Sequence, residues 1–251
     1  MTRTALVLAG VRPGRDPLAE FAGVSHKALI PIGGTPMLER VIAALRASGR
    51  IDRIAVSIDR PELVTLEGVE VLRSSTSVSR SVGEALEALG GPLLVTTADH
   101  ALLEPDWVRH FLDHLPDVDV VAGLARDRDV MAAAPDTKRT FLRFRDGRFS
   151  GCNLFHLRDR RALRAIQLWQ IVENERKKPF TLLRRLGLRA VFAHLAGRLT
   201  LAYAVRRIEE MAGCTAGIVE LPFGRAAIDV DKPDDLILVR RIVEQDAAAR
   251  A

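Results

Sequence analysis

Short apolar runs alternate with amphipathic stretches along the chain. Residues 4–9 form a compact apolar run that ends at Gly10, and 37–48 repeat apolar residues at helical spacing. A short run of β-forming residues bounded by glycine is typical of a buried strand in a parallel sheet, and the second pattern is typical of an amphipathic helix. Thr35 and Pro36 precede that helix, so we expect Thr35 as its N-cap and Pro36 as its first residue.

The same alternation continues toward the middle of the chain. Further strands are expected at 53–58, 69–72, 92–98 and 118–124, with a one-turn helix at 61–67 and a helix from Pro105 through 115. Residues 126–136 have the composition of a polar loop. Residues 138–149 alternate and turn at an Asp-Gly pair, which predicts a β-hairpin that continues into 151–157.

The last third is helical in pattern. Helices are expected at 159–175, from Pro179 onward and from Thr200 to Met211. We interpret 159–213 as a helical insertion. A strand at 226–230 and a final helix that begins at Pro233 complete the chain.

Strands that alternate with helices predict an α/β fold. We expect a Rossmann-like mixed sheet of about seven strands, mostly parallel and flanked by helices. The 251 residues are enough to bury a full core, and we expect a single domain over 1–251.

Composition narrows the classes of partner. The net charge is +5, and aromatic residues are 5% of the chain. A small basic excess with so few aromatics does not indicate a nucleic-acid surface, so no nucleic-acid partner is expected. Cys152 and Cys214 lack the spacing of a metal site or a disulfide framework, and the first apolar run is too short for a signal peptide. These features favour a cytoplasmic protein with reduced thiols.

A loop with glycines and arginines follows the first strand. Gly10 to Asp16 include Arg12 and Gly14, and a single lysine, Lys27, comes after the loop. Backbone N–H groups and arginines at the carboxyl end of a parallel strand suit a phosphate chain. The loop lacks the Gly-Lys-Ser/Thr of a Walker A motif. A simple turn between a strand and a helix explains the loop equally well.

Acidic residues occur at two distant positions that the predicted fold brings to strand ends. Asp99 follows the buried strand 92–98, and Asp229 and Asp231 flank Val230 before the last helix. In open α/β sheets, ligands bind at the carboxyl ends of the strands. Carboxylates that meet there fit an oxygen-liganded Mg²⁺, with Asp99 and Asp231 as ligands and Asp229 in support. The simpler alternative for each acid is a helix cap.

The loop, the lysine and the following turn together resemble the signature of the nucleotidyltransferase superfamily. The residues that carry the resemblance are Leu8, Ala9, Gly10, Arg12, Gly14, Lys27, Pro31, Gly34, Pro36, Met37 and Leu38. The stretch from Asp229 to Leu236 resembles the acidic motif that closes many of these enzymes. Val11 departs from the pattern because the family usually has a second glycine there, and a positive φ is costly for valine.

This superfamily includes sugar-1-phosphate and sugar-acid nucleotidyltransferases, the molybdenum-cofactor guanylyltransferase, and cytidylyltransferases of methylerythritol and inositol phosphates. The resemblance implies a Mg²⁺-dependent transfer of a nucleoside monophosphate to a phosphorylated acceptor. It implies catalytic roles for Lys27 and Arg12. The implied nucleotide-binding residues are Leu8, Ala9, Gly10, Gly14 and Ser81. The implied acceptor-binding residues are Lys138, Arg139, Thr140 and Asn153.

The substrates are less constrained than the reaction. Ser81, Val82 and Leu86 have the spacing of the base-facing loop in the cytidylyltransferases, and Asp99-His100 resembles a pair in the inositol-phosphate enzymes. Both features favour CTP and a phosphorylated polyol or lipid-headgroup precursor. A plain N-cap is the alternative role for Ser81. The alternatives to the reaction are molybdopterin guanylyl or cytidylyl transfer, sugar-1-phosphate activation, and a non-catalytic NTP-binding regulator.

Basic residues accompany apolar faces in the expected insertion. This combination suggests a lid, a homodimer surface or a peripheral membrane contact through 176–206. A helical cover for the core is the interpretation we favour over membrane contact.

Overall fold

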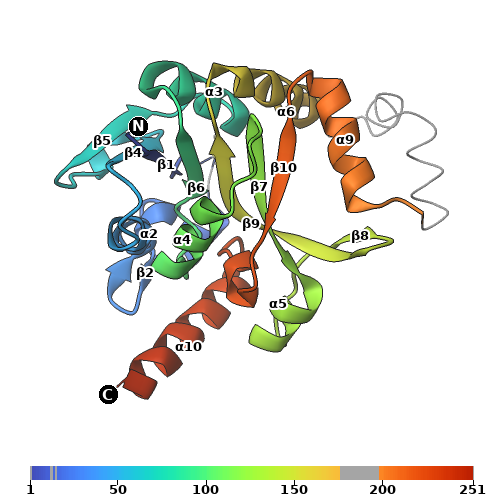
Figure 1. Cartoon of the computed structure of the whole chain (residues 1–251). Coiled ribbons are helices and arrows are strands. Elements are labelled where there is room, and N and C mark those ends of the chain that lie inside the picture. The colour runs from blue at the N-terminus through green and yellow to red at the C-terminus, as the bar shows by residue number, and fades with distance from the viewer. Residues whose placement is uncertain (1, 12–13, 15, 176–197, 251) are drawn as a thin grey trace.

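One mixed sheet runs through the middle of the protein (Figure 1). The computed structural model describes residues 2–11, 14, 16–175 and 198–250. Its eight-stranded sheet has the order β10-β7-β9-β6-β1-β4-β5, with β8 paired to β9. The strands of this sheet are β1 (Thr4–Leu8), β4 (Arg53–Ile58), β5 (Val69–Arg73), β6 (Leu93–Thr97), β7 (Val120–Arg126), β8 (Leu142–Phe144), β9 (Gly147–Leu157) and β10 (Ala216–Glu220).

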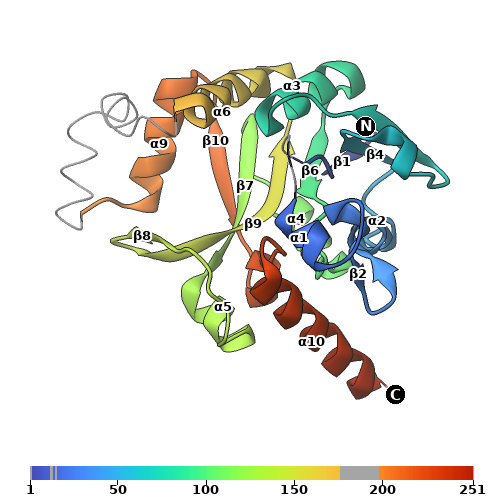
Figure 2. The same cartoon turned by 180° about the vertical axis from the view of Figure 1, so that it is seen from behind.

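Helices cover both faces of the sheet (Figures 1 and 2). The α-helices are α1 (Pro17–Phe21), α2 (Met37–Ala47), α3 (Val78–Leu89), α4 (Pro105–Asp113), α5 (Asp127–Ala133), α6 (Leu163–Glu175), α9 (Leu201–Ala212) and α10 (Pro233–Arg250). Short 3₁₀ turns are η1 (Lys27–Leu29), η2 (Pro61–Leu63), η3 (Arg160–Ala162) and η4 (Gly224–Ala227). Helices α2 and α4 pack on one face of the sheet, and α3 and α6 pack on the other. The predicted α/β fold is confirmed.

Strand β1 lies at the centre of the sheet and contributes to both cores. It pairs in parallel with β4 on one side and β6 on the other. Ala5 and Val7 join the core under α2 and α4, whereas Leu6 faces α3 and α6. This alternation explains why the sequence shows an unbroken apolar run here, because a strand buried on both faces has no polar side.

Strand β9 is the one antiparallel member of the central sheet in the described part of the chain, and it lies between β6 and β7. The parallel strands therefore share one carboxyl edge. The residues that follow them gather at this edge: Gly10 after β1, Asp59 after β4, Ser74 after β5 and Asp99 after β6. This is the edge at which open α/β sheets bind ligands.

The expected cap of the first long helix is wrong. Thr35 and Pro36 form β3 (Thr35–Pro36), which pairs with β2 (Pro31–Ile32), and α2 begins at Met37 without a side-chain cap. Gly33 and Gly34 have φ of 59° and 81°. Positive φ at both central residues is what a two-residue type I′ hairpin turn requires, so the glycine pair folds this segment back on itself.

Two further expectations on secondary structure are wrong. The expected polar loop at 126–136 contains helix α5, in which Asp127 and Asp129 occupy the first turn, where acidic side chains suit the helix dipole. The expected strand at 226–230 is replaced by the turn η4. The strand that pairs in parallel with β7 is β10, which the sequence pattern did not predict.

The expected insertion is helical in its described parts. Residues 160–162 and α6 account for the helix expected at 159–175, and α9 begins after Thr200, whose hydroxyl accepts the N–H of Tyr203. The helix expected from Pro179 lies outside the described residues. Within the described residues, no helix combines the length and the hydropathy needed to span a membrane.

Candidate functional site

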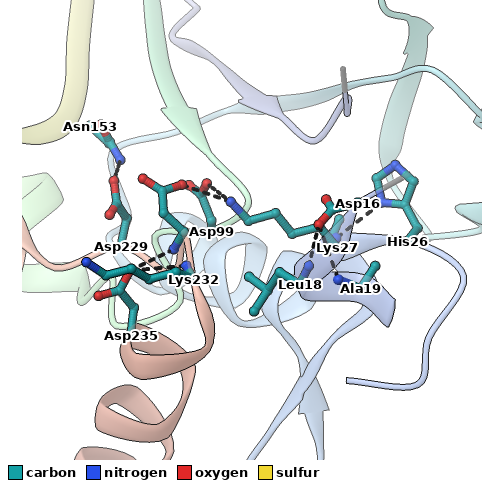
Figure 3. Close-up of polar contacts among 12 residues, drawn as sticks. Asp16, Leu18, Ala19, His26, Lys27, Asp99, Asn153, Asp229, Lys232 and Asp235 are labelled. Carbon is teal, nitrogen blue, oxygen red and sulfur yellow. Dashed lines mark hydrogen bonds and ion pairs between the residues drawn. The ribbon is translucent and has the colours of Figure 1, made fainter. Parts of the chain in front are cut away.

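Lys27 lies between two carboxylates that come from distant parts of the chain (Figure 3). Its ammonium donates to Asp99 Oδ2 at 2.7 Å and to Asp231 Oδ1 at 3.0 Å. The side chains of Lys27 and Asp99 are 19% and 20% exposed, whereas that of Asp231 is 64% exposed. The two expected acids therefore converge on Lys27. This lysine follows the loop 10–16, which is called the nucleotide loop below after the role that the sequence resemblance implies.

Backbone contacts hold this arrangement in place. Asp99 follows β6 by two residues, and its carbonyl oxygen accepts the N–H of Val230 at 3.0 Å. The side chain of Asp235 accepts the N–H groups of Asp231 and Lys232, each at 3.2 Å. Asp235 thus caps the start of α10 and fixes the segment that carries Asp231.

The charges of the site depend on one another. Burial raises the pKa of Asp99 above its ordinary value, although the Lys27 ammonium acts in the opposite direction. Burial lowers the pKa of Lys27, but Asp99 and Asp231 outweigh it and raise this pKa above its ordinary value. The lysine therefore carries a positive charge at neutral pH, in the place where an anionic substrate would need one.

Asp229 faces a different set of partners. It forms an ion pair with Arg139, and its Oδ2 accepts a hydrogen bond from Asn153 Nδ2 at 2.7 Å. Burial raises the pKa of Asp229, but the Arg139 guanidinium more than compensates and holds it below its usual range. Both oxygens of Asp229 are engaged. Asp229 is therefore held by Arg139 and Asn153, and its expected support of a metal site stays a prediction.

Asn153 reaches Asp229 from an irregular position in β9. Its φ is 48°, and the pairing of β9 with β7 shifts register at this level. Asparagine tolerates the left-handed region better than most residues, and a bulge reorients the side chain at its position. The bulge aims Asn153 at the site.

The nucleotide loop borders a cavity of about 500 Å³ at the carboxyl edge. The residues that line it include Ala9, Gly10, Lys27, Asp99 and Asp231. Of the four positions 12–15, only Gly14 is described, with φ of 121°. Arg12, expected to be catalytic, lies outside the described residues.

Val11, which stands where the family usually has a second glycine, has no positive φ. Among the described residues, the non-glycine residue with positive φ is Asn153, so Val11 does not adopt the conformation that only glycine tolerates. The departure from the family pattern at Val11 therefore imposes no positive φ on this valine.

A second cavity, of about 280 Å³, adjoins the first. Leu8 and Gly10 form one wall, and Ser81 and Glu173 contribute to the others. The Ser81 hydroxyl accepts the N–H of Ser75 at 2.8 Å and donates to the Ser77 carbonyl at 3.0 Å. Ser77 is the N-cap of α3. Ser81 is thus not the cap; it shapes the serine loop that lines the cavity.

The expected acceptor-binding residues lie in two environments. Arg139 and Asn153 converge on Asp229, as described above. Lys138 pairs with Asp234 at 3.0 Å, but the two side chains are 72% and 62% exposed. Thr140 is exposed. The four residues therefore do not form one cluster.

Two carboxylates near Lys27, those of Asp99 and Asp231, could bind a metal ion. Asp99 Oδ1 is buried and accepts no hydrogen bond in the described part of the chain. Lys27 contacts the other oxygen of Asp99 and one oxygen of Asp231. Among the described residues, no group of three or more His, Cys, Asp or Glu side chains surrounds a single point. Two carboxylates suit Mg²⁺, which completes its shell with water and substrate phosphates.

Sequence reasoning missed several residues at this edge. Asp59 directly follows β4, so the rule that pointed to Asp99 could have found it. Glu173 of α6 accepts hydrogen bonds from the N–H and hydroxyl of Ser79 at the start of α3. No sequence signal indicated this contact, because it depends on how α6 packs against α3.

The two buried histidines predict a dependence of stability on pH. Burial lowers the pKa of both His100 and His156 from 6.5 to about 4. Between these values the unfolded chain binds protons that the folded chain does not. The free energy of unfolding should therefore fall as pH falls below 6.5, by up to about 1.4 kcal/mol per pH unit for each histidine.

Urea unfolding between about pH 7 and pH 5 measures this slope. His100→Phe, whose ring would still lie against Trp107, should remove one histidine's share of it. Replacing the exposed His114 with glutamine is the matched control and should keep the full slope. An equal slope in the wild type and in His100→Phe would contradict the prediction.

Arg139→Ala is expected to destabilise the fold. It would leave Asp229 as a buried carboxylate without its cation, at a cost of about 3–5 kcal/mol in the free energy of unfolding. Chemical denaturation measures the loss. Adding Asp229→Asn to Arg139→Ala removes the unpaired charge and should recover much of it. An unchanged midpoint in Arg139→Ala would show that the pair does not stabilise the fold.

Comparisons with known proteins bear on the family and the fold of the chain. Residues 5–186 match a family model described as a MobA-like NTP transferase domain. A hypothetical transferase from Thermus thermophilus is 34% identical over 94% of this chain and 100% of its own, with a TM-score of 0.82. No curated protein matches the chain.

Two more distant structures share the fold alone. A 4-diphosphocytidyl-2C-methyl-D-erythritol synthase from Anaerococcus prevotii is 12% identical, covering 97% of this chain and 98% of its own, with a TM-score of 0.60. A CMP:2-keto-3-deoxy-manno-octonic acid synthetase, solved with CTP, is 16% identical, covering 98% of this chain and 100% of its own, with a TM-score of 0.58.

Proposed function

Because the chain belongs to the MobA-like NTP transferase family and is a nucleotidyltransferase, we propose that it joins CMP from CTP to a phosphorylated small-molecule or lipid-headgroup acceptor. The observation that carries the proposal is the ammonium of Lys27, held by Asp99 and Asp231 beside the Gly10 loop. A cation fixed in this way beside a cavity of about 500 Å³ suits the transfer of a charged phosphoryl group.

The reaction forms one bond and breaks another at the same phosphorus. A phosphate oxygen of the acceptor attacks the α-phosphorus of the nucleotide. The bond from this phosphorus to the bridging oxygen of the β-phosphate breaks, and pyrophosphate leaves with that electron pair. The attacking oxygen is already anionic at neutral pH, so no residue needs to remove a proton. Catalysis depends on positioning and on the neutralisation of charge.

Lys27 neutralises part of this charge. Lys27 lines the cavity, where its ammonium can contact an oxygen of the α-phosphate or of the acceptor. The backbone from Gly10 to Gly14 and the side chain of Arg12 would cradle the β- and γ-phosphates, as the family pattern implies.

Asp99 and Asp231 are the residues that would hold Mg²⁺. The buried, unpartnered Oδ1 of Asp99 and the exposed carboxylate of Asp231 support this assignment. The ion, when bound, supplies positive charge against the α-phosphate and the leaving pyrophosphate. Asp229 is assigned the acceptor side instead, where it orients Arg139.

The two cavities support a division of the substrates. The serine-lined cavity beside Leu8 and Ser81 would take the base and ribose. The acceptor would then approach from the side of Asn153 and Arg139, with Lys138 and Thr140 at the rim. The Nε of Arg139 is buried without a hydrogen-bond partner in the described part of the chain, and it would serve an anionic acceptor.

A second candidate function has one observation in its favour. The matching family model carries the description MobA-like, and the resemblance noted in the sequence extends to the molybdenum-cofactor guanylyltransferase. Guanylyl or cytidylyl transfer to molybdopterin is therefore the alternative. The two candidate functions share the same reaction and differ in the base of the nucleotide and in the acceptor.

The test is pyrophosphate release from each of the four NTPs with Mg²⁺, in the presence of a panel of phosphorylated polyols, sugar 1-phosphates and molybdopterin. We expect release with CTP that depends on a phosphorylated polyol or lipid-headgroup acceptor. GTP-dependent release with molybdopterin would support the second candidate. No release above the background for any pair of substrates would contradict both.

A further inference from the structure

A buried histidine stands immediately before the catalytic lysine (Figure 3). His26 is 2% exposed, and its Nδ1 accepts the N–H of Ala28 at 3.1 Å. Because Nδ1 receives a hydrogen, the neutral ring carries its own proton on Nε2. That Nε2 lies 3.1 Å from Asp59 Oδ1 and donates to it. The histidine therefore has a fixed orientation between the lysine turn and the end of β4.

The same oxygen of Asp59 holds the nucleotide loop. Oδ1 also accepts the N–H of Val11 at 3.0 Å, so a single carboxylate oxygen joins the loop to His26. The hydrogen bonds from His26 and Val11 hold the pKa of Asp59 below its usual value, although burial acts in the opposite direction. Arg73 donates to the backbone carbonyl of Asp59 at 3.0 Å and anchors this position to β5.

These contacts form one continuous path across the site. It runs from the N–H of Val11 through Asp59 and His26 to the N–H of Ala28, next to Lys27. The loop and the lysine belong to separate segments that follow different elements. Among the described residues, the side-chain hydrogen bonds that connect Val11 to the turn at Lys27 are those of Asp59 and His26.

We propose that His26 and Asp59 are a positioning pair that holds Val11, at the start of the nucleotide loop, at a fixed distance from Lys27. The proposal rests on the proposed function, in which the loop binds the phosphates and Lys27 neutralises the reacting one. In this arrangement the N–H of Val11 donates to Asp59 and does not bind a phosphate. Neither His26 nor Asp59 touches the substrate, so both act through the groups that they hold.

Substitutions at Asp59 separate positioning from simple support of the fold. Asp59→Asn keeps an oxygen that can accept from both Val11 and His26. Asp59→Ala removes it. We expect Asp59→Ala to raise the Kd for CTP about tenfold and to lower kcat by a similar factor, because hydrogen bonds to a charged group are lost. Asp59→Asn should stay near the wild type, and the KM for the acceptor should not change in either variant.

His26→Asn tests the other half of the path. Its shorter amide can still accept from Ala28 but does not reach Asp59. We expect it to reproduce the effects of Asp59→Ala, and the double variant should add little, because both changes break the same connection. Asp52→Ala is the matched control. Asp52 also accepts a backbone N–H, from Arg3, but at the opposite end of β4, and its replacement should leave the Kd and kcat unchanged.

Amide exchange at Val11, measured by NMR on the whole chain without substrate, is a readout that does not depend on activity. The exchange should be protected in the wild type and faster in Asp59→Ala and His26→Asn. A lower melting temperature with wild-type Kd, kcat and Val11 exchange would overturn the proposal. If the wild type neither binds CTP nor releases pyrophosphate, the proposed function fails. Faster exchange at Val11 in both variants would then support the connection, and unchanged exchange would overturn it.

Discussion

Replacing Lys27 with alanine is expected to lower kcat by about 10²–10³-fold, the usual cost of losing one preorganised charge contact to a transition state. The KM for the nucleotide should change less than kcat, because the ammonium acts most strongly on charge that develops during transfer. Steady-state pyrophosphate release with the preferred NTP measures both constants.

The size of this effect depends on the surroundings of Lys27. Its partners Asp99 and Asp231 keep the ammonium in one place before substrate arrives, so little reorganisation is needed when the phosphate binds. Arginine at this position carries the charge but has a larger, forked head, and we expect it to restore only part of the rate. Lys232→Ala, at a neighbouring lysine, is the control and should keep the wild-type kcat. If Lys27→Ala retained that kcat too, the assigned role would be wrong.

The second large effect concerns the paired carboxylates. Asp99→Asn and Asp231→Asn are each expected to lower Mg²⁺-supported turnover by about 10²–10³-fold, since each removes a charged ligand of the ion and a partner of Lys27. The concentration of Mg²⁺ that gives half-maximal turnover should rise in both variants. A titration of turnover against Mg²⁺ measures it.

The two positions should differ in their effect on the fold. Asp99 is buried, and its oxygen lies 2.7 Å from the ammonium of Lys27, so Asp99→Asn leaves a largely buried cation with one remaining carboxylate and should lower the melting temperature. Asp231 is largely exposed, and its replacement should change stability little. Asp234→Asn, also exposed and close in sequence, is the control for activity. Full Mg²⁺-dependent turnover in both site variants would remove the metal assignment.

Part of this site could be predicted because Asp99 follows a strand and because Lys27 and Asp231 lie in recognisable segments. Lys27, Asp99 and Asp231 belong to short segments with a family signature, and the strand rule places Asp99 at the ligand-binding edge. Residues 4–9 indicated a buried strand clearly, since a strand covered on both faces has no polar positions. Local pattern was sufficient for these features.

The features of the fold and the site that the sequence did not predict depend on tertiary contacts. One partner of Asp229, Asn153, reaches it from a bulge in β9 that no sequence periodicity predicts. The strand expected at 226–230 failed because Gly224 packs against the backbone of Asp129, so closely that a Cβ there would lie 1.9 Å from its carbonyl oxygen. That contact favours a tight turn over an extended strand. Similarly, Gly33 and Gly34 form a hairpin turn that places Thr35 in β3, so Thr35 does not cap α2.

The distance in sequence between Lys27 and Asp231 has a consequence for biosynthesis. The two residues are 204 positions apart, and the later one precedes the final helix, α10. A nascent polypeptide can assemble β1, β4 and β6 while it is still on the ribosome. At that stage Asp99 is present, but Asp231, the second carboxylate that contacts Lys27, has not yet been added. Competence for chemistry thus requires synthesis to pass residue 231, because a product that stops earlier lacks one of the two carboxylates that hold Lys27.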